Sequence, residues 1–241
     1  MAVGPETPRV LGVGSSKGGV GKTQTAVTLA HLATEQGYRV LLADADPNLS
    51  ASDWATRAEG LTFDVDDLQD GGPAVLTRLR ELRDYDLVVV DLPGAKSSDA
   101  WSALLHGTAG APVLDALVVP SAVRTMDLRP VVRVIRDAVI PAGVPYLLVG
   151  TLVKTPSLPN ALQELGEIAA GPAGISVART VIRDLTVHAE AVTWDRAVTE
   201  MPGGRHSTAR AAEREYRNLA FEVFAGLLGM KWSSTQEEVE V

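Results

Sequence analysis

The chain of 241 residues contains no cysteine. This absence excludes disulfides, iron–sulfur clusters and thiolate zinc sites. No apolar run is long enough to span a bilayer, and the first ten residues, MAVGPETPRV, lack the pattern of a signal peptide. We therefore expect a soluble cytoplasmic protein.

Positive charge is also scarce, since 22 Lys and Arg residues face 30 Asp and Glu residues, for a net charge of −8. Taken alone, this balance argues against a nucleic-acid-binding protein, although a local arginine face can still attract phosphate groups. Several of the acids lie in the last eight residues, STQEEVEV, which are typical of a disordered end.

Hydrophobic residues make up 46% of the chain, which is enough for a full core. Continuous apolar runs alternate with helical patterns, as in a parallel sheet covered by helices on both faces. We expect one α/β domain with a doubly wound, mostly parallel sheet. The predicted strands cover residues 9–15, 38–46, 61–65, 86–94, 114–121, 144–153 and 174–182, and the predicted helices cover 22–36, 50–58, 72–85, 128–139 and 207–228.

The last predicted helix has an apolar stripe at helical spacing, the normal pattern for packing on a core. No repeat, linker or internal domain boundary is evident. We expect a disordered N-terminus over residues 1–8, the folded domain over 9–229 and an acidic disordered tail over 230–241. The stripe consists of Ala212, Tyr216, Leu219, Val223 and Leu227.

The segment SSKGGVGKTQTA, residues 15–26, places a glycine-rich turn between a predicted strand and a predicted helix. Such a turn directs backbone N–H groups at phosphate, and the positive end of the helix reinforces them. A strict P-loop would have glycine at position 16; this chain has Ser16 there and reads KGGVGKT from Lys17 to Thr23, the deviant P-loop. The pattern predicts that Lys22 contacts the β- and γ-phosphates and that the Thr23 hydroxyl ligates Mg²⁺.

Together with DADPNLSASDW (residues 44–54) and VVVDLPG (residues 88–94), this loop resembles the ParA family of plasmid and chromosome partition ATPases, relatives of MinD. The resemblance extends loosely over residues 9–228 and is sharp over 15–54 and 86–94. It implies a P-loop NTPase that uses ATP and Mg²⁺ and forms an ATP-dependent homodimer. In such dimers the lysine at the position of Lys17 reaches the nucleotide of the second subunit.

The resemblance also implies roles for three aspartates. Asp91, at the end of an apolar strand, matches the carboxylate that holds the metal, and Asp44 is expected near the metal through water. Asp46 is expected to position the attacking water, although two solvated turn acids before Pro47 are the alternative. The sequence departs from the family at Asn48, where glutamine is common. The predicted catalytic residues are Lys17, Lys22 and Asp46, and the predicted metal ligands are Thr23, Asp91 and Asp44.

No N-K-x-D motif for reading guanine is present, which favours ATP over GTP. No strong general base and no arginine finger from the same chain is evident, so we expect slow hydrolysis that a partner stimulates. Base contacts at Thr151 and Pro202 follow from family position only; a buried strand threonine and a loop proline are the alternatives. The predicted nucleotide contacts are Lys17, Gly18, Gly19, Val20, Gly21, Lys22, Thr23, Gln24, Thr151 and Pro202.

Two helical segments carry arginines at i, i+4 and i+7, and a solvated helix face explains either set without function. The resemblance favours the second set for DNA, because ParA dimers bind duplex DNA non-specifically through basic residues in their C-terminal part. Thr186 stands where relatives often have a further arginine. The first set is Arg129, Arg133 and Arg136; the predicted DNA contacts are Arg210, Arg214 and Arg217, with Arg205 nearby.

The leading hypothesis is a nucleoid-associated DNA-partition ATPase whose hydrolysis is triggered by a ParB-like centromere-binding adaptor. A close alternative is that the same ATPase cycle positions a protein cargo, such as a carboxysome. The sequence does not distinguish this function from DNA partition. MinD-like membrane cycling is disfavoured, because the apolar segment FEVFAGLLGMKW leads into an acidic tail. A metabolic enzyme with a deviant P-loop, such as dethiobiotin synthetase, has no evident need for both Lys17 and Asp46.

Overall fold

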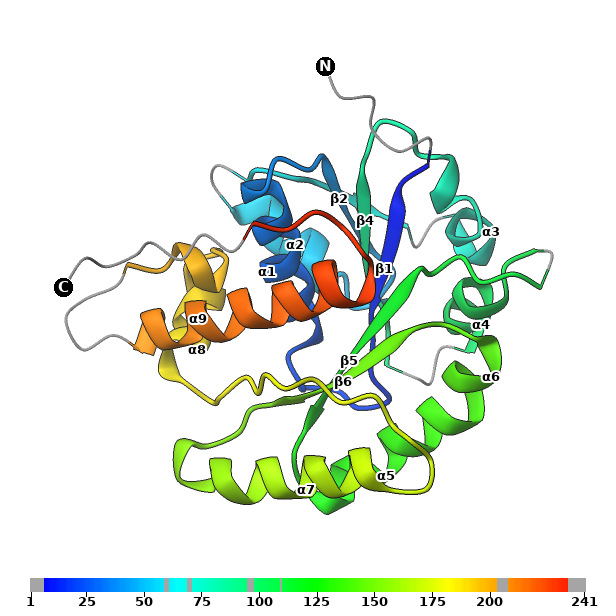
Figure 1. The fold of residues 1–241 in the computed structure, drawn as a ribbon. Helices are drawn as coiled ribbons and strands as arrows, with labels where there is room; N and C mark the ends of the chain where they lie inside the picture. Colours follow the sequence, from blue (N-terminus) through cyan, green and yellow to red (C-terminus); the bar gives the residue numbers. More distant parts are fainter. Residues whose placement is uncertain are drawn as a thin grey trace.

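The apolar runs of the sequence form the centre of the molecule, a six-stranded sheet in the order β3-β2-β4-β1-β5-β6 (Figure 1). All neighbouring strands are parallel. The computed structural model describes residues 7–58, 61–68, 71–94, 98–108, 110–202 and 208–233. The strands are β1 (Arg9–Val13), β2 (Val40–Asp44), β3 (Asp64–Asp67), β4 (Leu87–Asp91), β5 (Ala116–Ala122) and β6 (Tyr146–Thr151).

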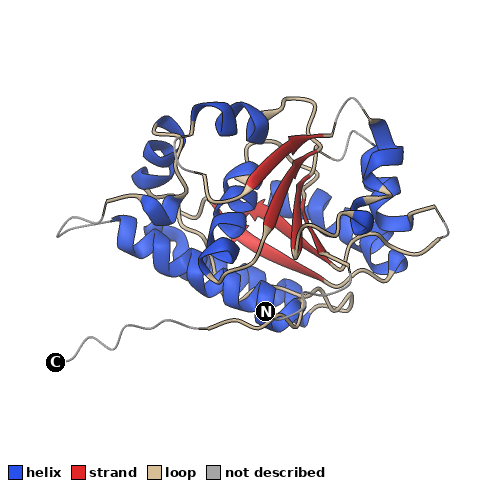
Figure 2. Cartoon of the chain, turned by 90° about the horizontal axis from the view of Figure 1, so that it is seen from above, coloured by secondary structure: helices blue, strands red, loops and turns tan. Residues whose placement is uncertain are grey.

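Helices cover both faces of the sheet (Figure 2). Each face has its own cluster of buried apolar side chains. Helices α1, α2, α8 and α9 pack on one face, while α3, α4, α5 and α7 pack on the other. The predicted doubly wound parallel fold is therefore confirmed. The helices are α1 (Lys22–Glu35), α2 (Ser50–Arg57), α3 (Gly72–Leu76), α4 (Ser98–His106), α5 (Thr125–Val134), α6 (Ile140–Ala142), α7 (Leu158–Ala170), α8 (Thr186–Thr193) and α9 (Thr208–Phe221).

The strand predicted over residues 174–182 does not form, and this prediction was wrong. The segment runs beside β6 but joins it only at isolated bridges, such as Leu148 with Val177. The carboxylate of Glu222 explains the interruption, because it accepts the backbone N–H groups of Arg179 and Thr180 at 2.8 and 2.9 Å. Those N–H groups are not available for a continuous ladder.

The single helix predicted over residues 72–85 is also wrong, since α3 ends at Leu76 and a separate 3₁₀ turn spans Leu79–Glu81. Leu76 and Leu79 are both buried, at 3% and 1% exposure. Both side chains belong to the same core cluster, so the chain stays packed on the sheet on both sides of the break. Helices α4, α7 and α8 were not among the predicted elements.

The terminal helix carries the predicted apolar stripe. Tyr216, Leu219 and Val223 are at most 1% exposed, and α9 continues into a π-helical turn over Glu222–Leu227. The packed chain extends beyond the boundary expected at residue 229, because the Trp232 ring stacks on Phe224 with centroids 4.6 Å apart. Within the described ranges, no helix combines the length and the apolar character needed to cross a membrane.

The topology brings the predicted site together at one edge of the sheet. Asp91 is the register partner of Val13 on one side and of Asp44 on the other. The carboxyl ends of β1, β2 and β4 therefore meet, and the glycine-rich turn starts directly after β1. This edge is where open α/β sheets bind their ligands.

Candidate nucleotide and magnesium site

Glycine-specific backbone geometry shapes the loop between β1 and α1. Gly19 and Gly21 have φ values of +69° and +80°, in the left-handed region that L side chains rarely adopt. A Cβ added at Gly18, Gly19 or Gly21 would meet no atom within 4 Å, so these glycines serve the backbone path and not close packing. The loop therefore leads its N–H groups over the amino end of α1, where a phosphate is favoured.

The first turn of α1 is tied to the end of β4 by one short hydrogen bond. The Thr23 hydroxyl donates to Asp91 Oδ2 at 2.5 Å. Asp91 has no exposed surface, and its second oxygen, Oδ1, is buried and has no hydrogen-bond partner among the described residues. Lys22 is also buried, at 9% exposure, in the same turn.

The pKa of Asp91 is raised to about 7, chiefly by burial and also by the nearby carboxylates of Asp44 and Asp46, against the lowering effects of the Thr23 hydrogen bond and of Lys22. A buried carboxylate with one unused oxygen beside a threonine hydroxyl fits Mg²⁺, which takes oxygen ligands and shares its shell with substrate phosphates. Among the described residues no group of three or more His, Asp or Glu side chains is arranged to hold a metal. The residues present therefore fit an ion that is shared with a nucleotide.

Asp44 has a structural role that the sequence did not reveal. Its Oδ1 accepts the N–H of Asp46 at 3.1 Å, and its Oδ2 accepts those of Ala51 and Ser52 at 3.0 and 2.9 Å. Asp44 thereby caps α2 from the neighbouring strand, since the N-cap residue Leu49 supplies no side-chain bond and has a φ of +50°. Water-mediated contact between Asp44 and the metal stays a prediction.

Asp46 lies on the loop that Asp44 holds, and it is 8% exposed. Its Oδ1 accepts two hydrogen bonds from Asn48, one from the backbone N–H at 3.0 Å and one from the side-chain amide at 2.8 Å. From the sequence, Asn48 is evident only as a departure from the family pattern, and its contact with Asp46 was not predicted. An Asp-x-Asn turn at the end of a strand was the available signal.

Comparison with known proteins identifies the family of the chain. The profile of the CobQ/CobB/MinD/ParA nucleotide-binding domain matches residues 11–224, which is most of the chain. The chain belongs to this family. Its fold, a six-stranded parallel sheet with helices on both faces, is that of ParA/MinD-type P-loop ATPases.

Relatives were found in sequence and in structure. Maintenance of carboxysome distribution protein A (McdA) from Gloeobacter kilaueensis is 37% identical over 224 residues, covering 92% of this chain and 97% of the relative. The chromosome-partitioning ATPase Soj from Thermus thermophilus is 38% identical over 125 residues, 40% of this chain and 50% of Soj. The structure of a Cyanothece McdA variant with ATP superimposes with a TM-score of 0.69 at 15% identity, over 95% of this chain and 99% of the other.

In this ParA/MinD-type ATPase, the two P-loop lysines have different environments. Lys22 is buried, whereas the Lys17 side chain is 39% exposed and its Nζ lies 3.6 Å from Oδ1 of Asp127, in the first turn of α5. Lys17 is thus accessible to a second molecule. The ion pair with Asp127 was not predicted, because it joins segments far apart in the sequence.

Three predicted nucleotide contacts remain: Thr151 and Pro202, which are expected near the base, and Gln24, which follows the glycine-rich turn. The Thr151 hydroxyl donates to the carbonyl of Val20 at 2.9 Å, so it braces the P-loop from the end of β6. The Gln24 side chain donates to the carbonyl of His188 and so connects α1 with α8. Pro202 is exposed. Contacts of these residues with a nucleotide stay predictions.

The arginines predicted to contact DNA differ in environment. Arg210 and Arg214 are exposed on α9, but Arg217 donates to Glu35 at 2.7 Å and to Glu213 at 2.9 Å. Arg205 lies outside the described residues. On α5, Arg129 and Arg133 are exposed, and in the π-helical turn that follows, Ile135–Val139, Arg136 is paired with Asp137.

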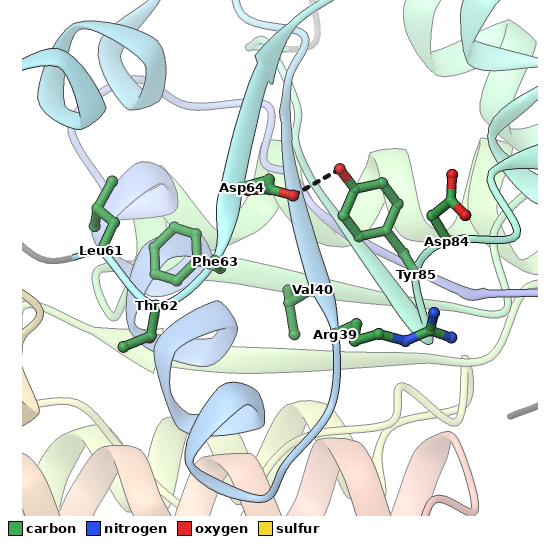
Figure 3. A pocket seen from close by; sticks show the side chains of 8 residues that line it. All are labelled: Arg39, Val40, Leu61, Thr62, Phe63, Asp64, Asp84 and Tyr85. Carbon is green, nitrogen blue, oxygen red and sulfur yellow. Dashed lines mark hydrogen bonds between the residues drawn. The ribbon is translucent and has the colours of Figure 1, made fainter. Parts of the chain in front are cut away.

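A hollow of about 350 Å³ lies at the opposite edge of the sheet, near the amino ends of β2 and β3 (Figure 3). Within it the Tyr85 hydroxyl donates to Asp64 Oδ2 at 2.8 Å. Since the ligand edge of the fold is at the carboxyl ends of the strands, this hollow is not part of the nucleotide site. Its lining residues are Arg39, Val40, Leu61, Thr62, Phe63, Asp64, Asp84 and Tyr85.

Proposed function

We propose that the protein is an ATP-switched positioning ATPase. ATP joins two copies face to face, the dimer holds duplex DNA without reading its sequence, and an adaptor bound to the cargo stimulates hydrolysis and release. The observation that carries the proposal is the contrast between the two P-loop lysines. Lys22 is buried beside Asp91, whereas the Lys17 side chain is 39% exposed and pairs with Asp127.

The nucleotide is ATP with Mg²⁺. The loop N–H groups and Lys22 hold the phosphates, while Thr23 and Asp91 hold the ion, which neutralises charge on the β- and γ-phosphates when it is bound. The unpartnered oxygen of Asp91 supports this assignment. ATP-bound McdA is consistent with it.

Hydrolysis depends on Asp46 and Lys17. Asp46, held at the carboxyl end of β2, orients the attacking water. Lys17 of one protomer crosses to the phosphates of the other and stabilises the charge of the transferring phosphoryl group, as an arginine finger supplied in trans does. Because this cation is absent until two copies meet, the ATPase is slow as a monomer.

DNA binds along the exposed side of α9 through Arg210 and Arg214. Contacts of this type go to phosphates, so binding is insensitive to sequence and weakens steeply with salt. Arg217 is less suitable, because two carboxylates already neutralise its guanidinium group. Arg129 and Arg133 on α5 form a second candidate surface for an anionic partner.

The cargo is a protein assembly. McdA resembles this chain over nearly the full length of both proteins, whereas Soj resembles it over 40% of the chain. A DNA cargo with a ParB-like adaptor is the second candidate, supported by the likeness to Soj. An adaptor gene beside this one separates the two, since a centromere-binding adaptor indicates DNA cargo.

Membrane cycling has less support. Phe224 is fully buried and Trp232 stacks on it, so these two aromatic groups near the C-terminus are used in packing, while Phe221 is 50% exposed. A membrane-binding helix needs these groups on an exposed apolar face. Co-sedimentation with anionic liposomes in the presence of ATP and Mg²⁺ tests this alternative, and we expect no binding.

The deciding experiment measures the ATPase rate with and without non-specific duplex DNA at about 50 and about 200 mM salt. We expect stimulation that fades at the higher salt, with DNA retention that requires ATP. A rate that responds to neither DNA nor salt, together with turnover that requires a small carboxylate substrate, would instead identify a metabolic ligase.

A further inference from the structure

The orientation of the Asp46 carboxylate is set by one neighbouring side chain. Both hydrogen bonds accepted by Oδ1 come from Asn48, at 3.0 Å from its backbone and at 2.8 Å from its side-chain amide. No described residue donates to Oδ2 of Asp46. The two oxygens of this carboxylate therefore differ: Oδ1 is occupied by Asn48, and Oδ2 can accept a hydrogen bond from another donor.

The loop around Asp46 is held independently of this contact. Asp44 binds the N–H of Asp46 and the first turn of α2, and the carbonyl of Asp46 accepts the N–H of Leu49 at 2.8 Å. These bonds fix the backbone on both sides of Asn48. The turn is therefore closed by these contacts with the backbone, and the hydrogen bond from the Asn48 side-chain amide is not needed to form it.

Burial does not explain why the Asn48 side-chain amide bonds to Asp46, because Asn48 is exposed. An exposed asparagine is free to hydrogen-bond with water, yet its Nδ2 lies on the same oxygen that its own backbone N–H binds. A carboxylate oxygen that accepts two N–H bonds is a poor acceptor for a further donor, whereas its partner oxygen keeps its lone pairs.

We propose that Asn48 is a positioning residue for hydrolysis: it fixes Oδ1 of Asp46 and so presents Oδ2 to the attacking water. This inference rests on the proposed role of Asp46 as the residue that orients water. An amide suits the task because it donates a hydrogen bond and carries no charge near the phosphates. A carboxylate at position 48 would have no N–H to offer from its side chain.

The substitution Asn48→Ala removes the bond at 2.8 Å and leaves the backbone bond at 3.0 Å, so the turn itself is retained. We expect single-turnover ATP hydrolysis to slow roughly 5- to 50-fold, because small losses of orientation are costly for an attacking group. The affinity for ATP, measured with a fluorescent analogue, and the thermal midpoint should remain near the parent values. Asn48→Gln, which keeps the amide, should recover part of the rate, and Asn48→Asp should be slower than Asn48→Ala.

Asn160→Ala, an exposed asparagine on α7, is the matched control and should hydrolyse ATP at the parent rate. Asp46→Ala separates two kinds of failure. If Asp46→Ala is inactive while Asn48→Ala keeps the parent rate, the role of Asn48 is wrong and the proposed function stands. If Asp46→Ala hydrolyses ATP normally, the role of Asp46 in the proposed function is wrong, and the inference falls with it. A loss of ATP affinity in Asn48→Ala that equals its loss of rate would show a merely structural residue.

Discussion

Lys17 and Asp127 form an ion pair within one protomer, with 3.6 Å between Nζ and Oδ1. Both side chains are partly exposed, and such pairs contribute between 0 and about 1 kcal/mol. A triphosphate carries far more charge than one carboxylate. We infer that Asp127 holds the lysine in the monomer without competing strongly with the nucleotide of a second copy.

This difference in strength gives the first prediction. Lys17→Ala should abolish ATP-dependent dimerisation in light scattering while some nucleotide binding by the monomer remains. Asp127→Asn should change the ATP-dependent dimerisation constant by less than about fivefold, since 1.4 kcal/mol corresponds to tenfold. Lys154→Ala, which removes an exposed lysine outside the P-loop, is the control. Normal dimerisation of Lys17→Ala would refute the trans role.

The second prediction concerns the buried charge of Asp91. Its pKa of about 7 is above that of an unfolded aspartate, so the folded protein binds the proton more tightly. Stability contributed by this group is present in acid and is lost as pH rises towards 7. In the absence of ligand, Asp91→Asn should therefore be more stable than the parent at pH 8, by at most about 4 kcal/mol, and similar to it only below about pH 4, where the unfolded aspartate is protonated as well.

Urea unfolding at the two pH values checks this effect. Mg²⁺ and nucleotide should reverse the order, because Asp91→Asn loses the carboxylate that fits the ion. A variant that gains as much thermal stability from Mg²⁺–ATP as the parent does would exclude Asp91 from the metal site. A stability difference that does not change with pH would contradict the raised pKa.

Much of this site could be predicted from the sequence, and the limits have physical causes. Apolar runs ending in aspartate indicated β2 and β4, and parallel pairing then required Asp44 and Asp91 to be neighbours. The capping of α2 by Asp44 and the bracing of the P-loop by Thr151 depend on which groups tertiary packing brings together. Local patterns do not contain that information. The segment 174–182 shows the same limit, because Glu222, far along the chain, takes the N–H groups a strand would use.

A third prediction follows from His188, which is 7% exposed and whose two ring nitrogens are buried. Burial lowers the pKa of His188, against the opposing influence of Glu215, the Arg183 backbone and Asp184. The folded state thus favours the neutral ring, and its contribution to stability is lost as pH falls below about 6.5.

His188→Leu should reduce the loss of unfolding free energy between pH 7.5 and pH 5.5, as measured by urea titration. The comparison must be made between variants, because Asp91 titrates in the same range with the opposite sign. His106→Gln, at an exposed histidine on α4, should leave the pH dependence unchanged. A parallel pH dependence in His188→Leu and the parent would show that His188 does not titrate in this range.

The last prediction separates DNA contacts from structural ion pairs on α9. Arg210 and Arg214 are exposed, and Arg217 is only partly exposed and bonds to Glu35 and Glu213. The hydrogen bond from His31, opposed by burial and aided by Arg217, lowers the pKa of Glu35 to about 2. The double substitution of Arg210 and Arg214 by Glu should therefore abolish ATP-dependent DNA retention on gels and leave DNA-free ATPase activity intact. Arg217→Gln should change DNA affinity by less than about threefold but lower stability by roughly 1 kcal/mol, since its partners are partly exposed.

Salt titrations give the same comparison an independent readout. Each lost phosphate contact reduces the slope of log affinity against log salt by about 1. Single Arg210→Ala and Arg214→Ala variants should show that reduction, because a phosphate contact releases counterions, whereas Arg217→Gln should keep the parent slope. If Arg217→Gln instead loses a full unit of slope, its guanidinium leaves Glu35 to bind DNA, and the ion pairs on α9 are a regulated part of the DNA surface.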